Sequence, residues 1–370
     1  MGMRMIGGAA IAGTFVLAAC GGGTGTSSSG GSSSSAVTLQ TGNPTTAQTL
    51  NEDGSSLLYP FLQLLETPLN TAYPNITLSP APGGSGKGIT DTISGAKDLG
   101  GSDAYLSAGQ AQQNTDIENI PIAVSAQDIY VNLPGVTSLK LSGDVLAKIY
   151  MGQITSWNDQ AIQSLNSGAT LPNTPIVPVR RQDNSGDTFL FSSFLSATNS
   201  SWSNGPSIGT TISWPALSTE VPATGNPGMV TKCKANPGCV AYVGISAQNT
   251  ANSAGLTLVQ LQNQSGNFLN ANPTTMEAAV DAAAGSVPDN LRQSLIYQSG
   301  ANAYPIVNFE YIMVKTDQSS SDKALAIRTF LAWAISASGG SQSTYLDKEH
   351  FIALPASIVS KVTAAIANIT

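Results

Sequence analysis

Apolar residues recur along this chain in two alternating spacings, and each spacing predicts one kind of secondary structure. Short alternating or continuous apolar runs predict β-strands at 37–41, 76–79, 120–124, 129–133, 176–179, 239–243 and 306–314. Apolar residues at helical spacing predict α-helices at 57–67, 88–94, 142–150, 189–195, 274–284, 324–337 and 356–366. Because strands and helices alternate, the pattern indicates an α/β fold with crossover connections between strands.

The N-terminal segment does not follow this pattern. Arg4 and the apolar stretch that follows it predict an export signal at 1–19, and a cysteine directly after Leu-Ala-Ala resembles a bacterial lipobox. We therefore expect lipidation of Cys20, with an ordinary signal peptide as the alternative. The stretch after Cys20 contains only Gly, Ser and Thr, so residues 20–36 are expected to form a flexible tether.

The rest of the chain is long enough for two domains of about 100–200 residues each. Its composition argues against a nucleic-acid partner, because the net charge is −7 and only 10% of the residues are charged. Two cysteines remain after Cys20, and they bracket a short loop. We expect a disulfide between Cys233 and Cys239, since no further Cys or His lies nearby to complete the alternative, a metal site.

Three Ser/Gly-rich segments, each followed by an apolar run of helical spacing, are candidate anion sites: 54–57, 83–86 and 181–187. A helix N-terminus presents unpaired backbone N–H groups and a partial positive charge, both of which attract oxyanions. Three such ends and one arginine would surround a small anion. The second segment departs from a nucleotide P-loop at two positions, so we do not expect a nucleotide there.

Two arginines follow the strand predicted at 176–179. An arginine fork pairs with a tetrahedral oxyanion through two parallel N–H groups, and Asp183 could hold such a fork in place. Neighbouring strand residues point to opposite faces of a sheet, so only one of Arg180 and Arg181 can take this role. The spacing alone does not choose between them.

Asp103 follows a predicted strand residue, Leu99, in the segment Gly-Gly-Ser-Asp-Ala. A carboxylate beside a buried anion is strongly repelled unless a proton lies between the two groups. Hydrogen phosphate and dihydrogen phosphate keep an O–H at neutral pH, whereas sulfate does not. Asp103 therefore predicts discrimination in favour of phosphate, and a simple turn-capping aspartate is the alternative.

Six segments carry a resemblance to a known family, and they occur in the family's order: 53–60, 84–89, 101–107, 139–159, 181–194 and 237–244. On these motifs the chain resembles the extracytoplasmic phosphate-binding lipoproteins of the PstS family, the receptors of phosphate-specific ABC importers. The resemblance extends from about residue 37 to the end of the chain. Within the fourth segment, residues 149–159 are expected to serve packing and turns in the second lobe, with docking to a transporter as the alternative.

The resemblance implies a set of phosphate-binding residues: Ser55, Ser56, Leu57, Ser85, Asp103, Arg181, Ser185, Gly186 and Asp187. In this set Ser56, Leu57 and Ser85 would donate hydrogen bonds, and Asp103 would accept the phosphate proton. Arg181, rather than Arg180, falls on the family's ligand arginine. Asp187 stands where many relatives have threonine, and a second acceptor there would favour a more protonated phosphate.

The family has an α/β, two-lobed periplasmic-binding-protein fold (type II-like), with the ligand in the interlobe cleft. For this chain the resemblance implies lobe one at 37–128 and 305–370 and lobe two at 129–304. The implied ligand is inorganic phosphate, and the implied partners are the membrane permease and ATPase subunits of a phosphate ABC importer. The implied location is outside the cytoplasm, on the bacterial cell membrane through a lipid anchor.

Two other functions stay open at this stage. One is a receptor for another oxyanion, such as sulfate or molybdate. The other is a phosphate-releasing hydrolase, but the sequence has a single histidine, His350, and no Gly-x-Ser-x-Gly segment in the right setting. We therefore expect no enzyme, no catalytic residue, no cofactor and no metal site.

Overall fold

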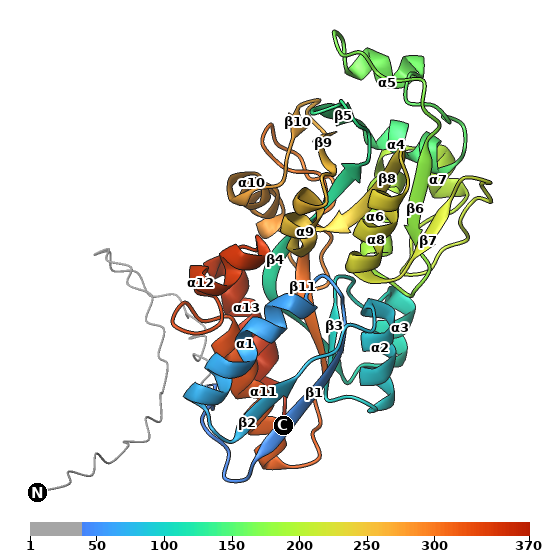
Figure 1. Cartoon of the computed structure of the whole chain (residues 1–370). Coiled ribbons are helices and arrows are strands. Elements are labelled where there is room, and N and C mark those ends of the chain that lie inside the picture. The colour runs from blue at the N-terminus through green and yellow to red at the C-terminus, as the bar shows by residue number, and fades with distance from the viewer. Residues whose placement is uncertain (1–38) are drawn as a thin grey trace, which may run out of the picture.

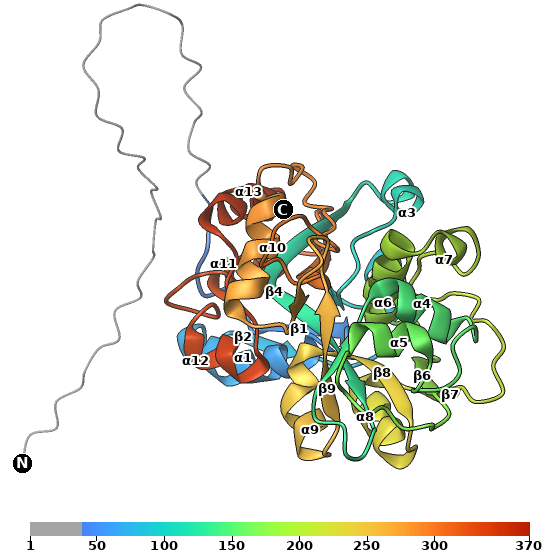
Figure 2. The same cartoon turned by 90° about the horizontal axis from the view of Figure 1, so that it is seen from above.

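The computed structural model describes residues 39–370, so the predicted signal peptide, lipidation site and tether lie outside the described residues. Figures 1 and 2 show the arrangement of the elements. The strands are β1 (Gln48–Gly54), β2 (Ile76–Ser79), β3 (Leu99–Ser102), β4 (Ile117–Val131), β5 (Leu139–Leu141), β6 (Val177–Arg181), β7 (Val221–Ala223), β8 (Cys239–Gly244), β9 (Thr257–Gln262), β10 (Phe268–Leu269) and β11 (Val307–Lys315). The helices are α1 (Tyr59–Ala72), α2 (Ser85–Ser94), α3 (Ala108–Gln113), α4 (Gly143–Tyr150), α5 (Gln160–Leu165), α6 (Gly186–Thr198), α7 (Ser200–Asn204), α8 (Gly225–Ala235), α9 (Gln248–Ser253), α10 (Pro273–Ala284), α11 (Ser321–Ala334), α12 (Ser343–Leu346) and α13 (Ala356–Ala367), with short 3₁₀ helices η1 (Ile245–Ala247) and η2 (Asp347–Glu349).

The long strand β4 joins the two lobes. Its first part pairs antiparallel with β11, up to the pair Ala126 and Val307, and its last part pairs antiparallel with β8, beginning at Gln127 and Gly244. The strands follow the order β2-β1-β3-β11-β4-β8-β6-β7. In Figure 1 the elements before β4 lie on one side of it and those from β5 to β8 on the other. The two-lobed α/β fold predicted from the sequence is thereby confirmed.

Strands β1, β2 and β3 of the first lobe are parallel, and β11 runs antiparallel beside β3. Helix α2 packs on β1 and β3, α1 on β2, and α11 on β1. In the second lobe β6 pairs parallel with β7 and β8, while β9 pairs with β5, β10 and the end of β4. Figure 2 shows β6, β7 and β8 grouped with α4, α6 and α8, away from α1, α11 and α13.

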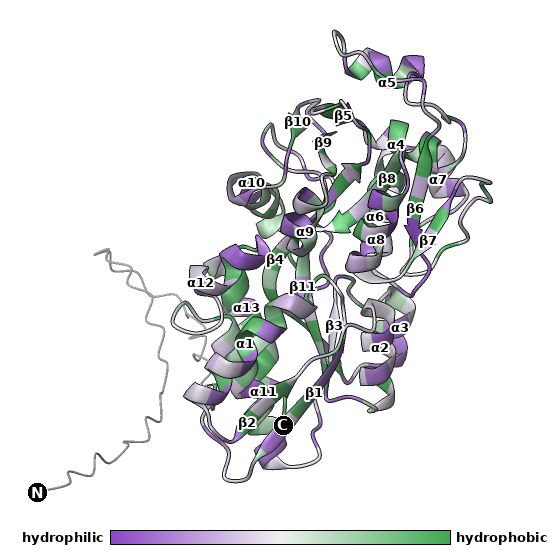
Figure 3. Cartoon of the chain, viewed as in Figure 1, coloured by the Kyte–Doolittle hydropathy of each residue, from purple (hydrophilic) through white to green (hydrophobic). Residues whose placement is uncertain are grey.

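Hydrophobic residues concentrate on the strands of both lobes and on the helix faces that cover them (Figure 3). Burying this apolar surface is the main favourable contribution to the fold, at about 25 cal/mol per Å². The charged residues within residues 39–370 lie mostly outside this core, and the buried exceptions are Glu52, Asp53, Asp103, Asp128, Arg181, Asp187 and Glu310.

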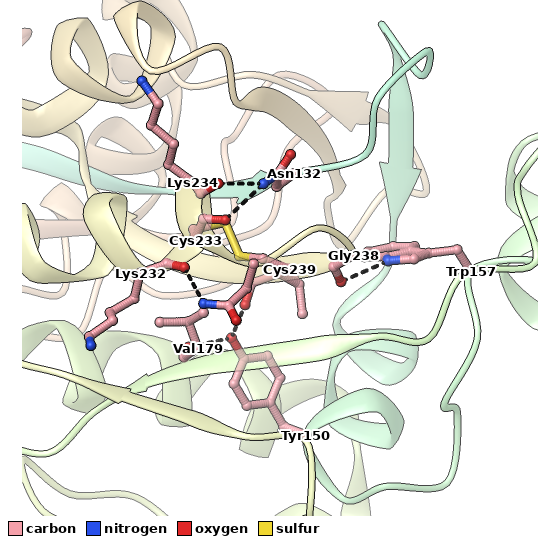
Figure 4. Close-up of a disulfide and its surroundings, with 11 residues drawn as sticks. Asn132, Tyr150, Trp157, Val179, Lys232, Cys233, Lys234, Gly238 and Cys239 are labelled. Carbon is pink, nitrogen blue, oxygen red and sulfur yellow. Dashed lines mark hydrogen bonds between the residues drawn. A yellow bond between two sulfur atoms is a disulfide. The ribbon is translucent and has the colours of Figure 1, made fainter.

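A disulfide joins Cys233, near the end of α8, to Cys239 at the start of β8, the pair predicted from the sequence (Figure 4). The surrounding loop is held by side chains from the segment 139–159 and from the end of β4. Trp157 is buried and donates its indole N–H to the carbonyl of Gly238 at 2.9 Å, and Asn132 donates to the carbonyl of Cys233 at 3.0 Å. These contacts give Trp157 the packing role expected for its segment.

Two strand predictions were wrong. Residues 39–41 form no strand, because α11 side chains hold this segment: Arg328 donates to the carbonyl of Gln40 at 3.2 Å. The two strands predicted at 120–124 and 129–133 are parts of the single strand β4. The polar residues Ser125, Gln127 and Asp128 interrupt the apolar run in the sequence, but they are buried within the strand. The exact lobe boundaries stay a prediction.

Glu52 is a buried carboxyl group in β1, a strand that the apolar pattern did not predict. Its Oε1 accepts the N–H of Gly101 at 2.9 Å and its Oε2 accepts the N–H of Ala81 at 3.2 Å. Burial raises the pKa of Glu52 from 4.5 to about 8, although both hydrogen bonds act to lower it. Between these pH values the folded protein binds the proton more tightly than the unfolded chain does.

We expect the free energy of unfolding of residues 37–370 to fall as the pH rises from about 4.5 to about 8. The folded-state pKa of Glu52 lies above the unfolded value, so its contribution is complete below pH 4.5 and is lost as the pH rises through 8. The slope for this one group is at most about 1.4 kcal/mol per pH unit. Denaturant unfolding at several pH values measures the slope, and Glu52→Gln should reduce it. An identical slope in parent and variant would contradict this assignment.

Candidate functional site

The N-termini of α2 and α6 meet between the lobes. A Cβ atom added to Gly186, the first residue of α6, would overlap the Oγ of Ser85 and the Oδ2 of Asp103. The N–H of Gly86, in α2, donates to the carbonyl of Asn184, just before α6, at 3.1 Å. Only glycine at position 186 therefore allows the two helix ends and the end of β3 to approach this closely.

The two helices begin in different ways. Ser185 is the N-cap of α6, and its Oγ accepts the N–H of Thr188 at 3.3 Å. Helix α2 instead begins at Ser85 itself, and its N-cap is Gly84, with φ of 92°. Glycine adopts this backbone conformation without strain. The Oγ of Ser85 instead accepts the N–H of Asp103 at 3.2 Å.

The segment before α1 completes the site from the first lobe. The hydroxyl of Ser55 donates to Oδ1 of Asp103, and its Oγ accepts the N–H groups of Leu57 and Leu58, each at 3.0 Å. Ser55 therefore orients Asp103, and the N–H of Leu57 is engaged by Ser55. The Oγ of Ser56 accepts the N–H of Asn226, at the start of α8, at 3.3 Å, a contact between the lobes.

Four backbone N–H groups at these helix ends have no acceptor within residues 39–370: those of Ser56, Ser85, Gly186 and Asp187. Buried backbone N–H groups are otherwise almost always paired. The hydroxyl hydrogens of Ser56, Ser85 and Ser185 are also free to donate, because each oxygen serves as an acceptor in the bonds described above. The site is thus rich in unused donors.

Arg181, only 2% exposed, supplies the positive charge of the site. Its Nε and Nη2 donate to the two carboxylate oxygens of Asp183, the Nε bond being 2.7 Å, and its Nη1 donates to Oδ2 of Asp187 at 2.7 Å. Of the five N–H groups of an arginine, two remain for a ligand. Burial acts to lower the pKa of Arg181, but the hydrogen bond to Asp183 and the neighbouring charges raise it overall.

Arg180 points away from this site. Its guanidinium forms two hydrogen bonds with Glu220, at 2.8 and 3.0 Å, on the opposite face of β6. The strand alternation noted in the sequence thus separates the two arginines, and the structure brings Arg181 to the candidate anion loops, with Asp183 holding its guanidinium as expected.

The carboxyl groups outnumber the single arginine. Burial raises the pKa of Asp103 well above its usual value, and the charges of Glu310 and Asp187 raise it further. Burial also raises the pKa of Asp187, against the lowering effect of Arg181. Burial also acts to raise the pKa of Asp183, but the hydrogen bonds and charge of Arg181 hold that pKa below its usual value. A site with this balance favours a ligand that brings its own proton to Asp103.

This arrangement can enclose a small oxyanion, donate to most of its oxygens and accept one proton from it. Among residues 39–370 no group of three or more His, Cys, Asp or Glu side chains is placed to hold a metal ion. Within the same range the Nε2 of His350 is buried and has no hydrogen-bond partner, so it contacts no serine hydroxyl. The geometry thus gives no support to the hydrolase alternative.

The comparisons with known proteins agree with this geometry. A family model described as the PBP superfamily domain matches residues 39–338. The phosphate-binding protein PstS of Methanocaldococcus jannaschii is 33% identical, over 71% of this chain and 72% of its own length. This chain belongs to the PstS family.

A second PstS relative, PstS3 of Mycobacterium bovis BCG, is 29% identical over 97% of this chain and 96% of its own length. Among solved structures, a putative phosphate ABC transporter substrate-binding protein from Clostridium perfringens, solved with bound phosphate, aligns with a TM-score of 0.60. Its sequence identity is 16%, with coverage of 83% of this chain and 100% of the solved chain, so this likeness shows the shared fold.

Three residues that sequence reasoning missed support the PstS-type site from other elements. Asn226 donates to Oδ2 of Asp187 at 2.9 Å, and Gln127 donates to Oδ1 of Asp187 at 3.1 Å. Together with Arg181, these donors give both carboxylate oxygens of Asp187 hydrogen bonds within the protein. The third residue, Glu310, lies on β11, whose pairing with β3 sets Tyr311 opposite Ser102 and so brings Glu310 beside Asp103. None of the three stands in one of the Ser/Gly-rich segments, so no local signal in the sequence pointed to them.

Gly186→Ala should weaken oxyanion binding at least tenfold without unfolding the protein. The added methyl group would displace Ser85 and Asp103 and keep the N-termini of α2 and α6 apart. Calorimetry with inorganic phosphate as the probe measures the loss. Gly109→Ala is the matched control, because a Cβ at that helical position meets no atom within 4 Å. Equal affinity in the Gly186 and Gly109 variants would show that the approach of the two helices is not required.

Proposed function

We propose that this protein binds inorganic phosphate outside the cytoplasm and delivers it to a phosphate ABC transporter. The observation that carries the proposal is the set of unused donors around Arg181 together with one buried acceptor, Asp103. Relatives across most of the chain's length are named phosphate-binding proteins, which supports a receptor rather than an enzyme.

The ligand would lie between the lobes. The free N–H groups of Ser56, Ser85, Gly186 and Asp187 and the two spare N–H groups of Arg181 would contact its oxygens. In this proposal Ser185 presents the N-terminus of α6, whereas Ser55 acts by orienting Asp103. Leu57 would donate to the ligand only if its N–H left the Oγ of Ser55. Asp187 would act mainly by holding Arg181.

Asp103 would select phosphate over sulfate. Its carboxylate already accepts from the hydroxyl of Ser55, and an additional lone pair can accept a P–O–H proton. Sulfate brings no proton at neutral pH, so its oxygen would face the carboxylate without a hydrogen bond in a buried setting. The cost of such a contact is several kcal/mol, which discriminates strongly between the two ions.

The partners and the location are proposed from the family and from the N-terminal sequence. The solved Clostridium perfringens protein is named an ABC transporter substrate-binding protein, which supports permease and ATPase subunits as partners here. No helix within residues 39–370 has both the length and the apolar character needed to cross a bilayer. We propose attachment to the membrane through a lipid on Cys20, with 20–36 as the tether.

Titration of residues 37–370 with phosphate and with sulfate in a calorimeter tests the proposed ligand. We expect stoichiometric phosphate binding and no comparable sulfate binding. Asp103→Asn should reduce the preference for phosphate at least tenfold, because an amide can donate to sulfate and no longer repels it. Selectivity that is unchanged in the variant would contradict the role given to Asp103, and tighter binding of sulfate than phosphate in the parent would overturn the proposed ligand.

Arg181→Ala should lose phosphate affinity by a factor of about a hundred or more, since it removes the buried positive charge of the site and leaves Asp183 and Asp187 without an ion-pair partner. Arg180→Ala is the matched control, because its pair with Glu220 lies on the other face of β6. The expected change for this control is less than about threefold, within the range of a surface ion pair. The reverse order of effects would assign the ligand arginine to position 180.

A further inference from the structure

Tyr242 is a fully buried tyrosine on β8, outside the set of predicted phosphate-binding residues. It lies where the pairing of β6 with β8 stops, because that ladder ends at Val179 and Ala241, two residues before Arg181. On its other edge β6 still pairs with β7, and the N–H of Gln182 donates to a carbonyl of β7 at 2.9 Å. Successive N–H groups of a strand point to opposite edges, so the N–H of Arg181 points toward β8, where no ladder partner remains.

The phenol of Tyr242 takes the place of that partner. Its hydroxyl oxygen accepts the N–H of Arg181 at 2.9 Å and shares a second hydrogen bond, also of 2.9 Å, with Oγ1 of Thr188. Thr188 follows Gly186 and Asp187 in the first turn of α6. One hydroxyl group therefore joins the end of β6, which carries the arginine, to the helix N-terminus that carries the unused N–H groups.

Aromatic neighbours fix the position of this hydroxyl group. The ring of Phe191, from α6, lies nearly parallel to the ring of Tyr242 with the centroids 4.5 Å apart, and the ring of Trp214 lies nearly parallel to it at 6.1 Å. A ring packed in this way has little freedom to move its hydroxyl group. Burial raises the pKa of Tyr242, so the phenol is neutral and keeps a hydrogen that it can donate to Thr188.

We propose that Tyr242 is a positioning residue for phosphate binding: its hydroxyl group sets the position of Arg181 relative to the N-terminus of α6. This inference rests on the proposed function. The spare N–H groups of Arg181 and the N–H groups of Gly186 and Asp187 have to converge on one small ion, so a shift of the strand end against the helix loses contacts with its oxygens. Tyr242 does not contact the ligand, and it acts through the main chain of Arg181 and the side chain of Thr188.

Tyr150, on α4, offers a matched comparison. It is also buried, and its ring contacts the ring of Tyr242. Its hydroxyl group donates to the carbonyls of Val179 on β6 and Val240 on β8, at 2.9 and 3.1 Å (Figure 4). Tyr150 thus links the same two strands, but it does so before the strand end that carries Arg181. Loss of its hydroxyl group should lower the stability of the protein without moving the site.

The test compares Tyr242→Phe with Tyr150→Phe, since each variant removes one buried hydroxyl group and keeps the ring. Denaturant unfolding without phosphate measures stability, and calorimetric titration with inorganic phosphate measures affinity. We expect both variants to be less stable than the parent. Only Tyr242→Phe should lose phosphate affinity, by about tenfold, while Tyr150→Phe should stay within about twofold of the parent.

A double variant separates the positioning of the arginine from a general loosening of the lobe. With Arg181→Ala in place there is no guanidinium to position, so adding Tyr242→Phe should cost less than about threefold in affinity, because residues that act as one unit are not additive. The same tenfold loss with and without the arginine would show that Tyr242 does not act through Arg181.

Tyr242→Phe with the affinity of the parent, or equal losses of affinity in Tyr242→Phe and Tyr150→Phe, would overturn the proposal. If Tyr242→Phe does not fold, Thr188→Val decides, because it removes the hydroxyl group that joins the phenol to α6. We expect Thr188→Val to bind phosphate at least about threefold more weakly than the parent, and unchanged affinity would contradict the inference. A parent that does not bind phosphate would instead reject the proposed function.

Discussion

The site depends on a shortage of positive charge. One buried guanidinium, that of Arg181, lies among the carboxyl groups of Asp183, Asp187, Asp103 and, behind them, Glu310. In a region of low dielectric constant this balance does not tolerate a further fully ionised anion unless protons are shared. We propose that the protein attracts its ligand through backbone dipoles and hydrogen bonds, and that it admits the ligand on the condition that the ligand carries a proton. An acidic protein can bind an anion on these terms.

The fold builds this site by bringing together chain segments that are distant in sequence. The end of β3 carries Asp103, the end of β6 carries Arg181, and the N-termini of α2 and α6 close over both. The continuous strand β4 passes between the lobes, so a change in its course at Gln127 would move one helix end relative to the other. Gln127 donates to both the carbonyl and the carboxylate of Asp187, which couples the crossing point of β4 to the site.

Patterns of neighbouring residues in the sequence predicted two parts of the site, the N-terminus of α6 and the arginine at the end of β6. The Ser-Gly start of α6 and the position of Arg181 at the end of a strand are properties of neighbouring residues, and the strand alternation explains why Arg180 lies outside the site. The resemblance to a family was needed to choose between the arginines beforehand. Leu39 to Thr41 look like a strand, but no neighbouring strand is available to pair with them, and α11 holds them instead.

The remaining features come from tertiary structure. Glu310 is the one acidic residue in the mostly apolar strand β11, and the antiparallel pairing of β11 with β3, Tyr311 opposite Ser102, gives it its place beside Asp103. Asn226 and Gln127 become part of the site only through tertiary contacts, both with Asp187 and, for Asn226, also with Ser56. Buried polar residues also hid the continuity of β4, because Ser125 and Asp128 interrupt its apolar pattern while their partners lie far along the chain. Buried polar residues of this kind reveal the course of a strand only once their hydrogen-bond partners are known.

A crystal structure of residues 37–370 grown with inorganic phosphate and without sulfate tests the central claim most directly. The account predicts a phosphate ion between the N-termini of α2 and α6, with Arg181 and the free backbone N–H groups as donors and one phosphate oxygen at hydrogen-bonding distance from Asp103. A phosphate ion bound elsewhere, or a carboxyl group of Asp103 turned away from the ion, would contradict it.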